Sequence, residues 1–280
     1  MRVFSLNHNQ ILTDVIKEFE ATNSIRDADR VVLWTDQIDI AEGIIGLAHN
    51  YRKPVITVQH GRHGSSRYYP PFNNPILADK MCVWGQRDKD ILVEYGHSAN
   101  KIEVTGTTIF QYLKPRVSHE GTNIVFYPEH WDKEVPENNA VARMLRKLRY
   151  KNKNIKIITK LIEDQDEKRY DNPIFSNRNN PDHLSICADI LSIADIVVGI
   201  EEGTFGLLAQ ATDTPVVIME EWSPKKFAED SRYKDYWRRI SEGSKRTTLA
   251  NLNETIGQQL TNPDELKEQR KQACILDGGI

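Results

Sequence analysis

The chain holds two short segments in which groups able to perform acid–base or phosphate chemistry are concentrated. The first is QHGRHG, residues 59–64, which combines the imidazoles of His60 and His63 with the guanidinium of Arg62 and two glycines. Imidazoles exchange protons near neutral pH, and glycines let the backbone approach a ligand closely. This composition favours a catalytic loop. The alternative is a surface turn in which glycine supplies positive φ and the histidines are incidental.

The second segment is EEGTFG, residues 201–206. Small residues that open a helix expose backbone N–H groups, and with the Thr204 hydroxyl these form an anion site suited to a phosphate or diphosphate. Glu201 and Glu202 would repel a phosphate held directly beside them, so we expect them to reach ribose hydroxyls, as acidic residues do in dinucleotide folds. The alternative is that both carboxylates only cap and charge the start of the helix.

Hydrophobic periodicity predicts that strands and helices alternate along the chain. Continuous β-branched runs are typical of strands buried on both faces, and apolar residues at helical spacing indicate amphipathic helices. The expected strands are 2–6, 31–35, 55–59, 81–84, 101–105, 123–127, 155–159, 195–200 and 215–219. The expected helices are 11–21, 40–50, 88–95, 138–150, 183–193, 249–260 and 263–274, and one more that the turn 201–206 opens and that ends at 211. This alternation predicts an α/β fold with parallel sheets.

The alternation restarts after a polar stretch near residues 114–122, which predicts two Rossmann-like domains, residues 1–116 and 117–280. In open parallel sheets, ligands bind at the carboxyl ends of the strands. Both segments above directly follow a predicted strand. Asp36, His130 and Lys160 also lie at or just after strand ends, so we add them to the candidate site residues.

Composition limits the classes of protein. The 280 residues are 39% hydrophobic and 28% charged, which indicates a globular protein and excludes disorder. A net charge of −3 argues against a wholly basic nucleic-acid coat but allows a local basic patch. Three distant cysteines predict neither a disulfide scaffold nor a cysteine-ligated zinc site. No apolar run approaches the roughly 20 residues that span a bilayer, so we expect a cytoplasmic protein without a membrane span.

Familiar catalytic signatures are missing. The sequence contains no GxxxxGK[ST], no GxGxxG after the first strand, no HExxH and no GxSxG. Their absence disfavours P-loop ATPases, dehydrogenases, zinc peptidases and α/β-hydrolases. Two stretches, 62–69 and 225–239, mix basic and aromatic residues and suit contact with sugars, bases and phosphates. Their alternative is an exposed, solvated charged surface.

The order of these motifs resembles the GT-B superfamily of nucleotide-sugar glycosyltransferases. The resemblance rests on ITVQHG, ADKMCVWGQRDKDILVEYG, KIEVTG, NIVFYPEHW, ADIVVGIEEGTFGLLAQATDTPVVIME and ILDGG, which span most of the chain. Among bacterial surface-polysaccharide transferases, the CDP-glycerol glycerophosphotransferases and capsule Kdo transferases are the most similar in style. The resemblance implies two Rossmann-like domains facing each other across a cleft. At this chain length, the N-terminal acceptor domain would be trimmed relative to the superfamily.

The resemblance also implies an activity, namely transfer of a sugar or similar group from a nucleotide-activated donor to an acceptor hydroxyl, with no metal or other cofactor. His60 matches a strand-end histidine that is the candidate catalytic base, and Asp36 is the rival base or orients that histidine. The other expected contacts are with the donor and the acceptor. Arg62, His130 and Lys160 would neutralise the leaving diphosphate, Gly203 and Thr204 would hold phosphate, and Glu201 and Glu202 would hold ribose. The acceptor would be bound by His63, Arg67 and Tyr68.

Several alternatives stay open at this point. The acceptor is a glycan, a lipid-linked sugar or a hydroxylated base in DNA, and an oligomer would compensate for the trimmed domain. UDP-N-acetylglucosamine 2-epimerases share the architecture and carry an acidic pair at the donor turn, so a sugar-nucleotide epimerase is the second hypothesis. A non-catalytic module that binds nucleotides or nucleic acid on the same sheets is the third.

Overall fold

The structure is a computed structural model that describes residues 24–34, 39–59, 61, 75–128, 136–162, 167–176, 181–200, 202–220, 235 and 238–279. The chain divides into two compact units, one of residues 1–106 with residue 279, the other of residues 107–278 with residue 280. This division falls earlier than the predicted boundary after Arg116. The physical reason is that Ile109, Phe110 and Leu113, in and after the 3-10 helix η3 (Ile109–Tyr112), pack on the core of the second unit.

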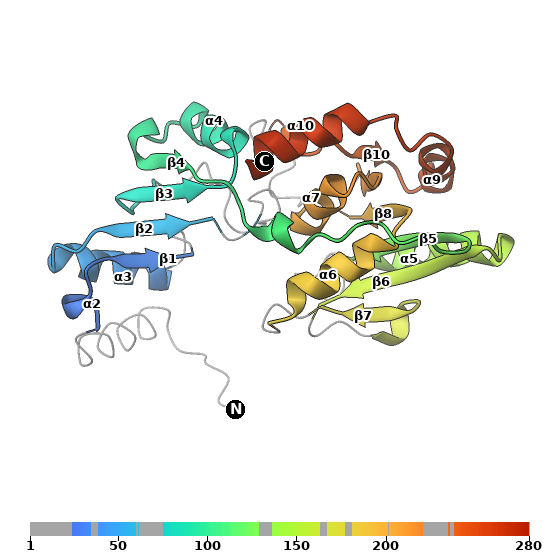
Figure 1. The fold of residues 1–280 in the computed structure, drawn as a ribbon, viewed down its shortest axis with the longest axis horizontal. Coiled ribbons are helices and arrows are strands. Elements are labelled where there is room, and N and C mark those ends of the chain that lie inside the picture. The colour runs from blue at the N-terminus through green and yellow to red at the C-terminus, as the bar shows by residue number, and fades with distance from the viewer. Residues whose placement is uncertain are drawn as a thin grey trace. The chain divides into compact units, whose positions relative to one another are not determined.

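The first unit is a four-stranded parallel sheet in the order β1-β2-β3-β4 (Figure 1). Its described elements are α2 (Ser24–Asp27), β1 (Val31–Leu33), α3 (Asp39–Asn50), β2 (Val55–Val58), β3 (Lys80–Val83), α4 (Gln86–Glu94), η2 (Ala99–Lys101) and β4 (Ile102–Val104). Apolar side chains of α3, β2, β3, α4 and β4 form one buried core. The predicted strand 2–6 and helix 11–21 lie outside the described residues.

The second unit is a six-stranded parallel sheet in the order β10-β9-β8-β5-β6-β7. Its remaining elements are β5 (Thr122–Tyr127), α5 (Pro136–Lys151), β6 (Ile155–Leu161), η4 (Glu167–Arg169), β7 (Pro173–Phe175), α6 (His183–Ser192), β8 (Ile196–Gly199), α7 (Thr204–Ala211), β9 (Val216–Met219), β10 (Lys245–Thr247), α9 (Leu252–Thr261) and α10 (Lys267–Gly278). The α/β fold class predicted from the sequence is confirmed.

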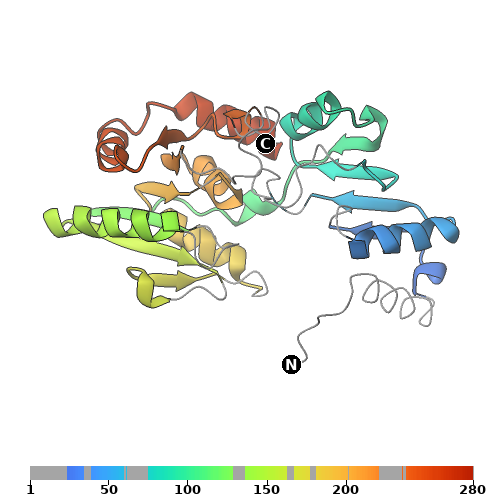
Figure 2. The same ribbon diagram turned by 180° about the vertical axis from the view of Figure 1, so that it is seen from behind.

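Helices cover both faces of the second sheet because alternate side chains of its strands point to opposite sides. Ile124 and Phe126 of β5 pack with α5 and α9, whereas Val125 and Tyr127 pack with α6 and α7. Figure 2 shows α5 in yellow-green across one face of this sheet, and α6 and α7 lie on the other face in Figure 1. Burial on both faces explains why β8 and β9 are continuous apolar runs.

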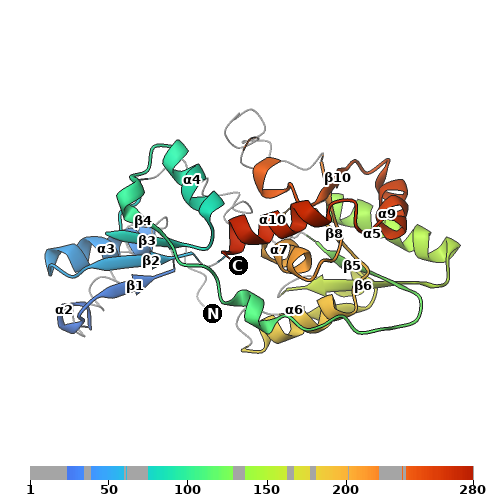
Figure 3. The same cartoon turned by 45° about the horizontal axis from the view of Figure 1, so that its top comes forward.

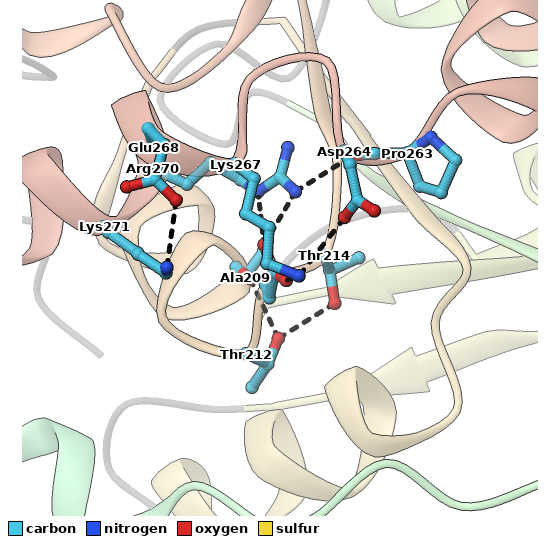
Figure 4. Close-up of polar contacts among 10 residues, drawn as sticks. Ala209, Thr212, Thr214, Pro263, Asp264, Lys267, Glu268, Arg270 and Lys271 are labelled. Carbon is cyan, nitrogen blue, oxygen red and sulfur yellow. Dashed lines mark hydrogen bonds and ion pairs between the residues drawn. The ribbon is translucent and has the colours of Figure 1, made fainter.

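Helix α7 is held at its C-terminal end by an ion pair between the buried Arg270 and the partly exposed Asp213. Asp213 lies in the turn after α7 with a positive φ of 57°. Arg270 of α10, which is 1% exposed, donates from Nε and Nη2 to Asp213 Oδ1 over 3.0 and 2.7 Å (Figure 4). Lys267 Nζ lies 3.1 Å from Asp213 Oδ2. Burial alone would raise the pKa of Asp213, but the hydrogen bonds from Arg270 and Lys267 outweigh it and hold that pKa below its usual value.

The same turn is closed by two threonines. Thr212 Oγ1 donates to Ala209 O over 2.8 Å and lies 2.9 Å from Thr214 Oγ1. Arg270 Nη2 also donates to Pro263 O over 2.8 Å, which joins the start of α10 to this turn. Figure 3 shows α10 beside α7, and the two helices are thereby packed as one layer of the second unit.

Among the described helices, none has the length and hydrophobicity to cross a membrane.

Replacing Asp213 with asparagine should destabilise the protein at neutral pH. Breaking a fully buried pair costs about 3–5 kcal/mol, but Asp213 is 43% exposed, so solvent screening reduces the expected loss to about 1–2 kcal/mol. Because the folded pKa is lowered, this stabilisation is present above the unfolded pKa of about 3.9 and disappears as the pH falls through the folded value. Urea unfolding at about pH 7 and about pH 3 measures both quantities.

The control for this experiment is Asp264→Asn. Asp264 also lies near Lys267, at 3.3 Å, but is 69% exposed and leaves Arg270 paired, so little change in unfolding free energy is expected. The proposed role of the ion pair would be contradicted if wild type and Asp213→Asn differed in unfolding free energy by the same amount at both pH values.

Candidate functional site

The strand order of the second unit reverses at β5. The chain runs from β5 outward through β6 to β7, and then returns to place β8, β9 and β10 on the other side of β5. In open parallel sheets, ligands bind outside the carboxyl ends of the strands at such a reversal. The candidate site of this unit is therefore at the ends of β5 and β8, where Tyr127 and Gly199 pair in register. The predicted segment 201–206 leaves the sheet at this position.

Tyr127 lies across the end of β8 and against the first turn of α7. A Cβ atom at Gly199 would stand only 2.1 Å from Cζ of Tyr127, so the ring occupies the space that a side chain would take. The Tyr127 and Phe205 rings meet edge to face with centroids 5.4 Å apart. Tyr127 was not among the site residues predicted from the sequence. The available signal was its position as the last residue of a predicted buried strand that ends in a polar loop.

The N-terminus of α7 begins at Gly203, which has an extended backbone (φ −150°, ψ −174°) and provides no side-chain cap. The first N–H groups of any helix lack partners within the helix and need a cap, water or a ligand. A Cβ atom at Gly203 would meet no atom within 4 Å, so there is open space beside this residue. Gly203 and Thr204 are thus brought to the carboxyl edge of the sheet as predicted, and their binding of phosphate stays a prediction.

Glu202 anchors the turn from inside the protein. It is fully buried, and its two carboxylate oxygens accept hydrogen bonds from Gln210 Nε2 at 3.0 Å and Ser244 Oγ at 2.5 Å. Gln210 Nε2 also donates to Ser244 Oγ over 2.9 Å, which closes the network. These contacts fix the residue before Gly203 to the loop before β10. The ribose contact predicted for Glu202 stays a prediction, and making it would require leaving Gln210 and Ser244.

Lys160 brings a positive charge to the same turn. It is the penultimate residue of β6, and its Nζ lies 5.5 Å from the centroid of the Phe205 ring, the second residue of α7. Such an ammonium over an aromatic face is attracted by the ring and is held beside the helix start. The structure therefore brings the Lys160 side chain to Phe205, two residues after Gly203, although Lys160 precedes Gly203 by more than 40 residues in the sequence.

In the first unit, a buried polar network holds the chain on both sides of position 60. Gln59 Nε2 donates to Asp88 Oδ2 over 2.9 Å and to Gly61 O over 3.0 Å. Trp84 donates its backbone N–H to Gln59 Oε1 over 2.7 Å and its indole Nε1–H to Gln59 O over 2.8 Å. Gln59, Trp84 and Asp88 are all buried. The ends of β2 and β3 are thus joined where the predicted catalytic loop leaves the sheet.

The sequence analysis did not assign roles to Gln59, Trp84 and Asp88. Their signal was that Gln59 and Trp84 are the last residues of the predicted strands 55–59 and 81–84. The other candidates, His60, Asp36, Arg62, His63, Arg67, Tyr68, His130 and Glu201, lie outside the described residues, so their roles stay predictions. Within the described ranges, no group of three or more His, Cys, Asp or Glu side chains could hold a metal ion.

Comparison with known proteins places the fold in a recognisable class. The chain matches no protein-family model and no curated protein. It is similar to the structure of a putative UDP-N-acetylglucosamine 2-epimerase from Listeria monocytogenes, with a TM-score of 0.66, 13% identity, and coverage of 95% of this chain and 74% of that one. It is also similar to a UDP-GlcNAc 2-epimerase from Neisseria meningitidis bound to UDP-GlcNAc. There the TM-score is 0.65 and the identity 14%, over 96% of this chain and 78% of that one.

A glycosyltransferase from Rickettsia africae is similar with a TM-score of 0.50 and 15% identity, over 98% of this chain and 77% of that one. At these identities, the likeness establishes the fold alone. The chain therefore has the two-unit Rossmann-like fold of GT-B type that these epimerases and glycosyltransferases share.

Replacing Gly206 with alanine should destabilise the turn. The added Cβ would lie 2.7 Å from Glu202 Oε1 and 3.1 Å from Tyr127 Oη, and Glu202 is fixed by two hydrogen bonds. We expect a loss of about 1–3 kcal/mol in unfolding free energy, even though alanine favours helices by about 1 kcal/mol. The matched control is Gly257→Ala in α9, where the Cβ would meet nothing within 4 Å and stability should rise slightly. Urea unfolding tests both, and a Gly206→Ala protein as stable as wild type would count against this packing.

Proposed function

We propose that the protein transfers a sugar, or a similar group, from a nucleotide-activated donor to an acceptor hydroxyl. The observation that carries the proposal is the start of α7 at the strand-order reversal. There, Gly203, which has no side chain to cap the helix, is followed by Thr204, and the ammonium of Lys160 lies 5.5 Å from the centroid of the Phe205 ring. Helix N-termini of this kind bind phosphate groups. The Neisseria meningitidis epimerase of similar fold is bound to UDP-GlcNAc, which supports a nucleotide-sugar ligand.

In the proposed mechanism, the backbone N–H groups after Gly203 and the Thr204 hydroxyl bind the donor diphosphate. Lys160, with Arg62 and His130, neutralises the charge that develops on the leaving nucleoside diphosphate, which is the main electrostatic demand of the reaction. The buried position of Glu202 argues for assigning the ribose contact first to Glu201. Because these cations supply the neutralisation, the mechanism includes no bound metal.

The proposed base is His60, with Asp36 as the alternative base or as the group that orients the imidazole. An imidazole suits this role because its ordinary pKa lies near neutrality. The buried Gln59–Trp84–Asp88 network supports the assignment, since it fixes the backbone next to position 60. His63, Arg67 and Tyr68 are proposed to contact the acceptor. The proposed acceptor is a surface glycan of the kind used by CDP-glycerol or Kdo transferases, or alternatively a hydroxylated base in DNA. The proposed location of the enzyme is the cytoplasm.

A sugar-nucleotide epimerase is the second candidate, favoured by the TM-scores of 0.66 and 0.65 with two epimerases against 0.50 with the glycosyltransferase. Product analysis distinguishes the two. An epimerase converts the sugar nucleotide without an acceptor, whereas a transferase consumes it only when an acceptor hydroxyl is added, apart from slow hydrolysis. A purely binding module would leave the sugar nucleotide unchanged in both experiments.

Donor binding should depend on Lys160. We expect at least one sugar nucleotide in a panel to raise the unfolding temperature, because a ligand at about 100 times its Kd stabilises by about 2.7 kcal/mol. Lys160→Ala should weaken that donor by roughly tenfold or more through loss of a charge-assisted hydrogen bond. The matched control is Lys156→Ala, an exposed lysine at the opposite end of the same strand, which should bind as wild type does. Absence of any shift across the panel would refute the proposed donor site.

Turnover should depend on His60. We expect His60→Ala to lower kcat by about 10²–10⁴-fold while leaving the donor-induced thermal shift unchanged, since loss of a general base affects the chemical step. His97→Ala is the control, because this histidine lies in the loop between α4 and β4 and has no role in the proposed mechanism. Turnover of His60→Ala within a few-fold of wild type would move the base assignment to Asp36, tested in the same way with Asp36→Asn.

A further inference from the structure

Basic residues of the second unit are concentrated on α5, the loop that follows it and the start of β6. Between residues 143 and 156 the chain has seven lysines and arginines and no acidic residue. The rest of the chain therefore carries 30 basic against 40 acidic residues, so positive charge is segregated onto this segment. We call it the α5 basic surface, and it consists of Arg143, Arg146, Lys147, Arg149, Tyr150, Lys151, Lys153 and Lys156.

The charged groups of this surface face away from the core. The opposite side of α5 is buried through Val141, Ala142 and Leu145, which pack against the sheet. A hollow of about 400 Å³ lies over the C-terminal part of the helix, lined by Arg146, Lys147, Arg149, Tyr150, Lys151 and Lys153. A concave site lined almost entirely by cations attracts a polyanion and holds it at several points.

Only part of this charge is neutralised within the protein. Asp171 accepts hydrogen bonds from Arg146 Nε and Arg149 Nη1, both over 2.9 Å. Lys147, Lys151 and Lys153 have no acidic side chain of the described part within salt-bridge distance. The arginines are thus held in place by Asp171, and the three lysines present their charge to solvent.

Tyr150 adds an aromatic platform to the hollow. Its side chain is 78% exposed, and Lys153 Nζ lies 4.7 Å from the centroid of its ring. Exposed aromatic rings next to cations are the feature on which proteins stack the bases of single-stranded nucleic acids, while the cations contact the phosphates. A large exposed ring has no comparable use in binding simple anions.

We propose that the α5 basic surface binds single-stranded nucleic acid, with phosphates on Lys147, Lys151 and Lys153 and a base stacked on Tyr150. An anionic membrane fits less well. Helices that bind membrane surfaces insert an apolar face, and the apolar side of α5 is already buried in the core. The surface ends next to the start of β6, at the amino edge of the sheet. The proposal therefore does not depend on the proposed donor site, which lies at the carboxyl edge.

Fluorescence anisotropy with a labelled oligothymidine of about 20 nucleotides tests this proposal on the full chain. We expect binding at about 50 mM salt that weakens as salt increases, with a log–log slope of roughly −2 for three phosphate contacts on a single strand. The triple reversal Lys147→Glu, Lys151→Glu and Lys153→Glu should lower the affinity at least tenfold. The matched control reverses three exposed arginines elsewhere, Arg30→Glu, Arg52→Glu and Arg246→Glu, and should lower it much less.

A second variant separates base stacking from simple charge attraction. Tyr150→Ala should weaken oligothymidine by roughly tenfold but leave binding of inorganic polyphosphate unchanged, because polyphosphate has no base to stack. Thermal unfolding of each variant shows whether it is folded.

The proposal would be overturned if oligothymidine did not bind at low salt, or if the control reversals lowered its affinity as much as the lysine reversals do. It would also be overturned if phosphatidylserine vesicles bound as tightly as oligothymidine and Tyr150→Ala changed neither affinity. The proposed function is tested separately, by whether any sugar nucleotide raises the unfolding temperature, so its failure is distinguishable from failure of this proposal.

Discussion

The parallel pairing of β5 with β8 is the constraint on which the candidate site depends. Paired residues of these two strands are 72 positions apart in the sequence, and the pairing reverses the strand order of the sheet. The reversal sends the chain after β5 and the chain after β8 to helices on opposite faces of the sheet, which is the position where open parallel sheets bind ligands. Tyr127 occupies the space above Gly199 at this position and rests on Phe205. These contacts fix the position and the direction of the first turn of α7 relative to the sheet.

Helix α7 is short, and its stability comes from tertiary contacts at both ends rather than from helix propensity. At the N-terminal end, Glu202 is tied to Gln210 and Ser244, and at the C-terminal end Asp213 is tied to Arg270. Helices of this length are marginal in isolation. The two anchors fix the helix near both of its ends, so the proposed phosphate ligand would meet N–H groups that are already positioned. Such preorganised N–H groups are more effective than flexible ones.

The two functional proposals use opposite edges of the same sheet. The carboxyl edge carries a helix start with glycine at its N-cap and one lysine, which suits a small phosphorylated ligand. The amino edge carries several unneutralised lysines and an exposed tyrosine, which suits an extended polymer. A chain with a net charge of −3 needs such segregation to hold a polyanion, because the remainder of the surface repels it.

The amino-acid sequence by itself determined the α/β class, the order of most elements and the loops that follow the strands, because buried parallel strands are continuous apolar runs. It did not reveal β7 and β10, whose sequences PIF and KRT are short and in the latter case polar. Both are edge strands, and only pairing with a neighbour makes them strands. The burial of Glu202 was likewise decided by tertiary structure, since its partner Ser244 is 42 residues away and no local pattern distinguishes a buried carboxylate from a solvent-facing one.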